Sequence, residues 1–409
     1  MKRFVSFVAL TTLLALLLVA CGGQTATPPP APTEPSAPTT PEDPSGVTGT
    51  VTLWHAYGTG SAEEEAVNTL VANARAAYPD ATINMLQIPF DQIFNKFQNE
   101  VTSGAGPDMF IAPNDSLGDQ IRAGLLADLT EYVPMLEAEN VSPTAIEGMS
   151  LNGQLYAIPE SFKAVALYYN TSKVATPPTT TDELLALVRN GNTLVLNQSA
   201  YHNFGWMQAF GAELMDADGR CVADTTGGDT WLAFLQELKA EPNVTFSTDG
   251  GQADSLFKEG RADMTINGPW ALGDYRTALG DDLAVAAMPG STNPAGPMTG
   301  VDGFYVNINS ANISGAVALA MFLTSAESMD VYVNQAGHVP ARTDIAIESP
   351  LVQGFADAAQ TGVPRPQVPE LSNFWTPFGD AITKVLDGGA APDASITEAC
   401  ATMNAANNK

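Results

Sequence analysis

Short apolar runs with strand-like alternation and longer segments with helical spacing follow one another in the first third of the chain. Strands are predicted over residues 49–54, 81–88 and 108–112, and helices over residues 61–78 and 91–101. Ser61 followed three residues later by Glu64 is the pattern of a capped helix start. This order predicts an α/β fold with mostly parallel strands, in which ligands bind beyond the carboxyl ends of the strands.

Two extended segments with a polar stretch between them occupy residues 153–170. The first runs through Tyr156 to Pro159 and the second through Ala164 to Asn170, and Glu160 and Lys163 lie between them. Long extended segments of this kind can cross from one lobe of a protein to another. Farther on, Pro177-Pro178 followed by residues 181–184 indicates a loop that enters a capped helix.

A strand-to-helix corner is predicted at residues 264–270, Met-Thr-Ile-Asn-Gly-Pro-Trp. Met264 to Ile266 form a short buried strand, which ends at Asn267-Gly268-Pro269 because glycine permits unusual φ angles and proline cannot continue a ladder. Proline also suits the first turn of a helix. The indole of Trp270 is therefore held at a corner, where it serves either as a stacking surface for a ligand or as part of the core.

The beginning of the chain has the pattern of an export signal. Met1-Lys2-Arg3 is basic, residues 8–19 are apolar, and Leu18-Val19-Ala20-Cys21 resembles a lipoprotein cleavage site. We expect residues 1–20 to be removed and Cys21 to carry the lipid, although an ordinary cleaved signal or an uncleaved anchor is an alternative. Residues 21–46 are rich in Pro, Thr, Ala and Ser, which predicts a disordered spacer between the anchor and the folded body.

The charge of the chain limits its possible ligands, and its histidines and cysteines bear on metal sites and disulfides. The net charge of −28 argues against nucleic acid as a partner and disfavours anionic ligands. The three histidines are scattered, so no zinc site is expected, and no cofactor is predicted. In an exported chain the two remaining cysteines, Cys221 and Cys400, are candidates for a disulfide.

Four motifs resemble those of the solute-binding proteins of bacterial ABC importers. Gly-Pro-Asp-Met-Phe-Ile at 106–111 and Ala-Leu-Tyr-Tyr-Asn at 166–170 resemble strands of the broad family. Met-Thr-Ile-Asn-Gly-Pro-Trp at 264–270 is similar to the maltose/maltodextrin-binding branch, and Leu-Ser-Asn-Phe-Trp at 371–375 resembles a second family motif, a Trp just inside a late helix. The resemblance of these two motifs together points to oligosaccharides. The resemblance covers roughly residues 49–405.

The resemblance implies a periplasmic-binding-protein-like fold, with two α/β lobes joined by crossing hinge segments that close on a ligand. Carried over, the first lobe holds residues 47–162 plus 270–325, and the second holds residues 163–268 plus 326–409. This division places Cys221 and Cys400 in the same lobe, which favours a disulfide between them.

The resemblance also implies an oligosaccharide site, in which aromatic rings stack on apolar sugar faces and polar side chains bind the hydroxyls. Trp270 and Trp375 fall on the stacking positions of the family, and Tyr201 or Trp206 is a candidate for a third ring. Asp115 matches a carboxylate that accepts hydrogen bonds from sugar hydroxyls. The family's enteric maltose-binding protein has Trp where this chain has Ala112, so one stacking surface is lost or replaced. The remaining polar candidates are Lys163, Glu160, Thr59, Tyr57, His55 and Asp302.

The implied function is capture of maltose or maltodextrins for the membrane subunits of an ABC permease, by a monomer that is exported and lipid-anchored, facing the periplasm or the cell exterior. Another oligosaccharide such as trehalose, a sugar-degrading enzyme and a structural or adhesive lipoprotein are the alternatives. Of these, the enzyme is disfavoured, because the chain lacks the nucleophile-elbow, phosphate-loop and zinc-protease motifs.

Overall fold

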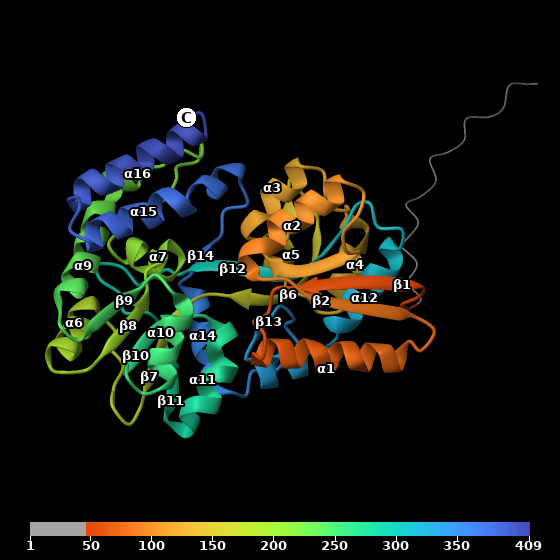
Figure 1. Cartoon of the computed structure of the whole chain (residues 1–409), viewed down its shortest axis with the longest axis horizontal. Coiled ribbons are helices and arrows are strands. Elements are labelled where there is room, and N and C mark those ends of the chain that lie inside the picture. The colour runs from red at the N-terminus through yellow and green to blue at the C-terminus, as the bar shows by residue number, and fades with distance from the viewer. Residues whose placement is uncertain (1–45) are drawn as a thin grey trace, which may run out of the picture. The chain divides into compact units, whose positions relative to one another are not determined.

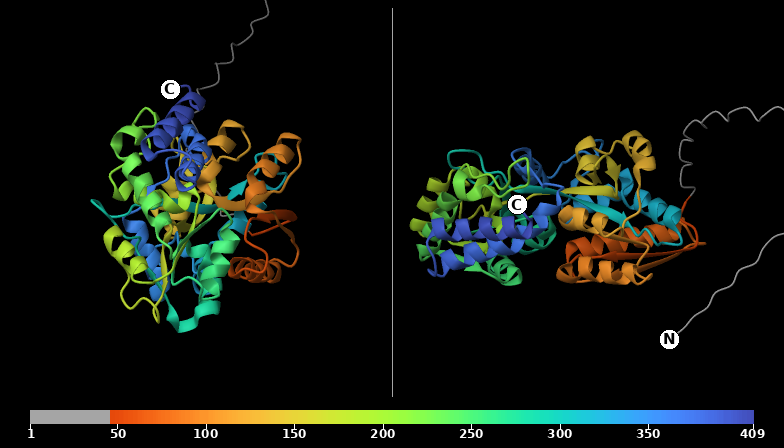
Figure 2. Two further views of the ribbon diagram at one scale, coloured as in Figure 1. Left: turned by 60° about the vertical axis from the view of Figure 1, so that its left-hand side comes forward. Right: turned by 90° about the horizontal axis from the view of Figure 1, so that it is seen from above.

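A computed structural model describes residues 46–409, which form two α/β lobes, each built on its own sheet (Figure 1, Figure 2). The predicted signal peptide, Cys21 and nearly all of the predicted spacer lie outside the described residues. No single helix within residues 46–409 is long and apolar enough to cross a membrane, and one bent pair, Ile313–Leu323 with Ala326–Ala336, meets that test only when the two are taken together.

The first lobe is built on a seven-stranded sheet. Its strands are β1 (Thr50–His55), β2 (Thr82–Gln87), β3 (Met109–Pro113), β6 (Ala157–Lys163), β12 (Met298–Val306), β13 (Val339–Pro340) and β14 (Val363–Pro364). Strands β2, β1 and β3 are parallel, as the sequence predicts, whereas β12 runs antiparallel to both β3 and β6. The carboxyl ends of β1, β2 and β3 therefore meet at one edge.

Helices and short turns complete the first lobe and share one apolar core with its sheet. They are α1 (Ala62–Ala77), α2 (Phe90–Thr102), η1 (Asn114–Ser116), α3 (Leu117–Arg122), η2 (Thr130–Tyr132), α4 (Val133–Ala138), α5 (Pro143–Gly148), α12 (Ile313–Leu323), α13 (Ala326–Val331) and η5 (Tyr332–Ala336), with the hairpin β4 (Ser150–Leu151) and β5 (Gln154–Leu155). The predicted cap of α1 is confirmed, because the Ser61 hydroxyl accepts a hydrogen bond from the Glu64 backbone N–H at 3.2 Å.

The second lobe is built on a five-stranded sheet in the order β11-β7-β10-β8-β9. The strands are β7 (Ala166–Asn170), β8 (Leu194–Asn197), β9 (Val244–Ser247), β10 (Met264–Asn267) and β11 (Leu283–Ala286). Its apolar residues alternate between two cores: Leu167 belongs to one face, and Ala166 and Tyr168 belong to the other. Both faces are covered by helices, which explains why these strands are continuously apolar.

Two sets of helices cover these faces. One face packs against α6 (Thr181–Arg189), α7 (Ala200–Ala209), α8 (Ala223–Thr226), α9 (Gly228–Ala240), η6 (Pro369–Asn373), α15 (Trp375–Leu386) and α16 (Pro392–Ala406). The other face packs against α10 (Gly250–Lys258), η3 (Pro269–Ala271), α11 (Leu272–Leu279), with η4 (Gly280–Asp282) after it, and α14 (Pro350–Gln360). A disulfide joins Cys221 to Cys400 on α16, with Cα atoms 5.2 Å apart, so the chain forms the predicted pair.

The lobe boundaries expected from the sequence require two corrections. Residues 270–295 belong to the second lobe, because α11 packs in its core, β11 pairs with β7, and Met288 and Ala295 lie in the core on the other face of its sheet. Residues 326–340 belong to the first lobe, because Met329 and Tyr332 lie in its core and β13 pairs with β6. Strands β6 and β12 run between the two groups of helices (Figure 1).

Candidate functional site

The corner that carries Trp270 forms as predicted, with β10 ending at Asn267 and a helical turn beginning at Pro269. The reason for glycine at 268 differs from the expectation. Its φ of −98° is ordinary, but a Cβ at this position would overlap the ring of Trp270. The indole therefore folds back over the Gly268 backbone, and only glycine permits this close approach.

Polar contacts hold this corner in place. The Asn267 amide donates to Asp254 and to the Tyr275 hydroxyl, each at 2.8 Å, and its side-chain oxygen accepts from the Gly268 N–H at 2.9 Å. The Tyr168 hydroxyl donates to the Gly268 carbonyl at 2.8 Å. The corner is thus anchored on both sides, and Trp270 is presented from a rigid support.

Four rings gather at the end of the second lobe's sheet, and we call Tyr201, His202, Trp270 and Trp375 the aromatic floor. The Tyr201 ring lies 6.1 Å from Trp270 and 6.5 Å from Trp375, and the His202 ring lies 6.0 Å from Trp270. All four side chains are only partly buried. Burial lowers the pKa of His202 to about 4, so its imidazole is neutral at pH 7.

Trp206 does not belong to the aromatic floor. The sequence left Tyr201 and Trp206 as the two candidates for a third ring, and Trp206 is the wrong one. Its side chain is fully buried, its ring N–H donates to the Pro289 carbonyl at 3.1 Å, and it packs edge-on against Phe234. Both faces of the indole are therefore committed to the core, and Tyr201 is the third partly exposed ring.

Arg365 connects the aromatic floor to the first lobe. It follows β14, and its guanidinium lies 5.4 Å from the Tyr201 ring centre and 5.8 Å from that of Trp375. The same group is ion-paired with Asp115 and donates to the Asn114 side-chain oxygen at 3.1 Å. Asp115, which follows β3, thus lies near the floor, where it is held by Arg365 of the segment that follows β14.

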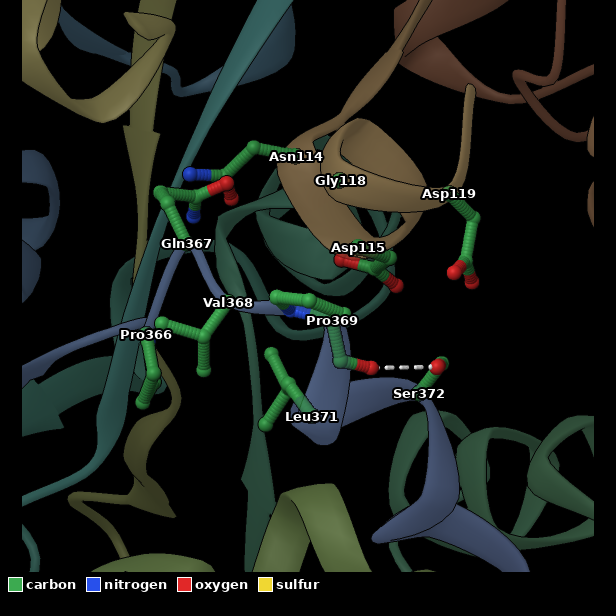
Figure 3. Close-up of a pocket in the computed structure, with 10 residues that line it drawn as sticks. All are labelled: Asn114, Asp115, Gly118, Asp119, Pro366, Gln367, Val368, Pro369, Leu371 and Ser372. Atoms are coloured by element: carbon green, nitrogen blue, oxygen red, sulfur yellow. Dashed lines mark hydrogen bonds between the residues drawn. The ribbon is translucent and has the colours of Figure 1, made fainter. Parts of the chain in front are cut away.

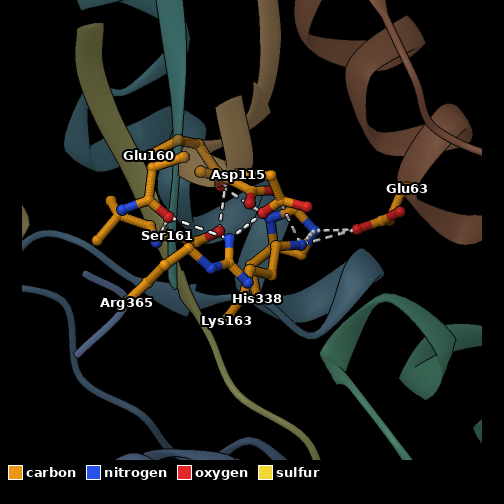
Figure 4. Close-up of polar contacts among 10 residues, drawn as sticks. Glu63, Asp115, Glu160, Ser161, Lys163, His338 and Arg365 are labelled. Atoms are coloured by element: carbon orange, nitrogen blue, oxygen red, sulfur yellow. Dashed lines mark hydrogen bonds and ion pairs between the residues drawn. The ribbon is translucent and has the colours of Figure 1, made fainter. Parts of the chain in front are cut away.

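Five buried charged groups lie where the crossing strands leave the first lobe, and we call Glu63, Glu160, Lys163, Asp302 and His338 the hinge cluster. The Lys163 ammonium contacts Glu63 at 3.0 Å and Asp302 at 3.2 Å. The His338 ring contacts Glu63 and Glu160, each at 2.8 Å. Lys163 and Glu160 belong to β6, Asp302 belongs to β12, and His338 precedes β13, so the cluster joins three strands (Figure 4).

Burial and pairing shift the pKa values of the hinge cluster. Burial alone would raise the pKa of Glu63, but Lys163 and His338 lower it to about 2. Burial alone would lower the pKa of His338, but Glu160 and the hydrogen bonds to both glutamates raise it to about 9. Burial raises the pKa of Asp302 to about 6, although Lys163 opposes this shift. At neutral pH Glu63 and Asp302 are therefore carboxylates, and His338 is protonated.

Two other predicted residues border the hinge cluster. Tyr57 is buried, and its ring centre lies 6.1 Å from that of His338 and 5.6 Å from that of His55. The Tyr57 hydroxyl, the Tyr332 hydroxyl and Oδ1 of Asp302 have no hydrogen-bond partner among the described residues. Thr59 is exposed in the loop before α1, and its role in binding stays a prediction.

Sequence reasoning missed Arg365, Glu63 and His338 as parts of these groups. A usable signal was present, because the chain has only 17 Lys and Arg against 45 Asp and Glu. A buried cation in so acidic a chain must have a specific carboxylate partner. The partners of Arg365, however, lie 250 residues away in the sequence, and no local pattern connects them.

The arrangement suits a neutral ligand with apolar faces and many hydroxyl groups. Partly exposed rings offer stacking surfaces, and Asp115 and Arg365 offer an acceptor and donors at their edge. Within residues 46–409, no group of three His, Cys, Asp or Glu side chains could hold a metal ion.

The chain is similar to known sugar-binding proteins along most of its length. A family described as bacterial extracellular solute-binding protein matches residues 69–361. The solved structure of a Thermus thermophilus maltotriose binding protein superposes with a TM-score of 0.79 at 30% identity, covering 87% of this chain and 100% of that one. A maltotriose-binding protein of Pyrococcus abyssi is 28% identical, covering 83% of this chain and 78% of that protein. A maltooligosaccharide ABC transporter solute-binding lipoprotein of Streptococcus pneumoniae is 23% identical, covering 94% of each.

Proposed function

The chain belongs to the bacterial extracellular solute-binding proteins, and we propose that it captures malto-oligosaccharides between its two lobes and delivers them to an ABC importer. The aromatic floor is the observation that carries this proposal. Three large rings and a neutral imidazole gather on one lobe, and the ion pair of Arg365 and Asp115 lies at their edge. A chain of pyranose rings presents the alternating apolar faces and hydroxyl rims that such a site recognises.

In this proposal the aromatic side chains and the Arg365–Asp115 pair contact the sugar directly. Trp270, Tyr201 and Trp375 stack on successive rings, while Asp115 accepts from hydroxyls and Arg365 donates to them. Glu160 has a different part, because Ser161 donates to one of its oxygens at 2.6 Å and His338 occupies the other. We propose that Glu160, Lys163, Asp302, Tyr57 and His55 form the hinge wall of the cleft, with Oδ1 of Asp302 as the acceptor that remains free.

Closure around the sugar follows from the placement of the crossing strands. Strands β6 and β12 pass between the lobes, and the hinge cluster fixes the point at which they leave the first lobe. We propose that the lobes rotate about this point and close on the ligand, as in hinged binding proteins. The closed form is then presented, as a monomer, to the permease, and Cys21 with its spacer tethers the folded body to the membrane outside the cytoplasm.

The family is described by solute binding rather than by catalysis, and the test of the proposed function separates the two. Isothermal titration with maltose, maltotriose, trehalose and glucose should give tight binding of at least one malto-oligosaccharide and no turnover. Preferential binding of trehalose would mean that trehalose is the ligand, and the proposed role in sugar capture for an ABC importer would still hold. Hydrolysis of the sugar, or no binding of any sugar, would overturn the proposal.

A further inference from the structure

The two sides of the aromatic floor are supported in different ways. On the side of Trp375, Arg365 lies over the ring and is paired with Asp115, and the gap beside Asp115 has room for only about one water molecule (Figure 3). On the side of Trp270, a chain of hydrogen bonds leads from the floor to α10, which packs on the other face of the sheet. This chain ends at Asp254.

Asp254 accepts two hydrogen bonds through one carboxylate oxygen. The Asn267 amide donates to Oδ1 at 2.8 Å, and the Tyr275 hydroxyl donates to the same atom at 2.7 Å. A carboxylate has no proton to give, so it requires the NH₂ group of Asn267 to face α10. The backbone N–H of Gly268 donates to the Asn267 side-chain oxygen at 2.9 Å and favours the same orientation from the other side.

The orientation of Asn267 determines which nitrogen of His202 carries the proton. The imidazole is neutral at pH 7, and its Nε2 lies 3.4 Å from the Asn267 oxygen. That oxygen can only accept, so the proton is on Nε2, and Nδ1 accepts from the Ser199 hydroxyl at 2.7 Å. Both ring nitrogens are therefore committed to protein partners, and the imidazole offers a ligand only its C–H groups.

His202 stands edge-on to two rings of the aromatic floor. Its ring meets Trp270 at 84°, with centres 6.0 Å apart, and meets Tyr201 at 88°, with centres 5.7 Å apart. Edge-to-face packing is a preferred arrangement of aromatic rings and depends on their mutual angle. A rotation of the imidazole would therefore displace both neighbours, so the groups that hold His202 also hold the stacking surfaces.

We propose that Asp254 is a positioning residue of the sugar site. Through Asn267 it holds the imidazole of His202 in one tautomer and one orientation, and His202 acts as a spacer between two stacking rings rather than as a hydrogen-bonding partner of the sugar. The inference rests on the proposed function and deepens it, because the geometry of the floor is then controlled by a carboxylate that does not touch the ligand.

The first test removes this carboxylate and keeps every ring of the floor. Asp254→Ala leaves the Asn267 amide with Tyr275 as its remaining acceptor, and we expect maltotriose affinity, measured by calorimetry, to fall roughly fivefold. Asp254→Asn retains an acceptor oxygen and should stay within about twofold of the wild type. Asp274→Ala is the matched control and should also stay within about twofold, because Asp274 acts on the pKa of Asp254 only through its charge.

The second test does not depend on sugar. The chain has three histidines, so NMR of the imidazole nitrogens, with His202→Gln to identify the signal, shows which ring nitrogen of His202 is protonated. We expect the Nε2–H tautomer in the wild type and in Asp254→Asn. In Asp254→Ala we expect a mixture of both tautomers, because the Tyr275 hydroxyl can donate as well as accept and does not fix the amide of Asn267.

Tyr275→Phe keeps the test decisive if Asp254→Ala folds poorly, because it removes the other acceptor of the Asn267 amide and retains the carboxylate. It should preserve both the affinity and the tautomer. The Nδ1–H tautomer in the wild type, unchanged affinity and tautomer in Asp254→Ala, or equal losses in Tyr275→Phe would overturn the positioning role. A wild-type protein that binds no malto-oligosaccharide would instead overturn the proposed function, whatever the tautomer of His202.

Discussion

The guanidinium of Arg365 lies over the ring of Tyr201, 5.4 Å from its centre, while its N–H groups reach Asp115 and Asn114, which follow β3 of the first lobe. A planar cation between an aromatic face and a carboxylate is a favourable arrangement, worth about 0.5–2 kcal/mol for the ring contact alone. Arg365 thus connects the aromatic floor to the end of β3 in the first lobe.

Replacing Arg365 should therefore weaken sugar binding. We expect Arg365→Met to reduce affinity by roughly 1–2 kcal/mol, because both the ring contact and the ion pair with Asp115 are lost. Arg365→Lys should recover little, since an ammonium lacks the planar stacking surface. Titration calorimetry measures the effect, and Arg342→Met is the matched control because Arg342 is also buried but pairs with Glu139 and Asp344. Unchanged affinity in Arg365→Met would contradict this role.

Trp270 and Trp375 are expected to carry much of the ligand contact. Each change to alanine should cost on the order of 1–3 kcal/mol of binding free energy, because a large stacking surface is removed. The chain has five tryptophans, and Trp54, Trp206 and Trp231 are buried in the cores. The ligand-induced change in tryptophan fluorescence should therefore disappear in the Trp270→Phe, Trp375→Phe double variant and persist in Trp206→Phe. Persistence in the double variant would remove both rings from the site.

Gly268 sets the position of the Trp270 ring, since any Cβ there would overlap the indole. We expect Gly268→Ala to displace the ring and to weaken binding by at least about tenfold, or roughly 1.4 kcal/mol. Thermal unfolding should change less than binding, because the glycine has ordinary backbone angles. A variant that keeps wild-type affinity would show that the ring position does not matter for the ligand.

The disulfide between Cys221 and Cys400 should act on stability alone. The two residues are 179 positions apart, and the bond ties α16 to the segment before α8. The Cys221→Ser, Cys400→Ser variant should lose about 2–5 kcal/mol of unfolding free energy and keep its sugar affinity. Denaturant unfolding measures the first effect, and calorimetry measures the second. An affinity loss as large as the stability loss would mean that the bond also shapes the cleft.

Local pattern was sufficient for the corner at Trp270, because a buried strand, a breaker and a helix start follow directly from residue types. It was insufficient to choose between Tyr201 and Trp206. Both lie on α7, whose polar residues His202, Asn203 and Gln208 are spread around the helix, so the sequence offers no single polar face that would orient it. Only packing against Phe234 and the Pro289 carbonyl shows that Trp206 points inward.

Contacts between residues far apart in the sequence explain the other differences between the predicted and the observed structure. Strand β11 pairs with β7 and strand β13 pairs with β6, and in both cases the partner lies far away in the chain. The lobe boundaries predicted from the sequence were wrong for this reason. Arg365 and His338 were missed on the same ground, because Asp115 and Glu63 become their partners only when the fold is complete.

The hinge cluster should make stability depend on pH above neutrality. His338 has a folded pKa of about 9, above its ordinary value of 6.5, so its contribution is complete below pH 6.5 and is lost as pH rises through 9. Asp302 titrates in a separate window, between 3.8 and about 6. The loss of the His338 contribution should therefore lower the melting temperature between pH 7 and 9. This fall should be absent in His338→Gln, because the glutamine side chain does not titrate. An identical decline in the variant would show that another group is responsible, because removal of the imidazole would then have had no effect on the pH dependence.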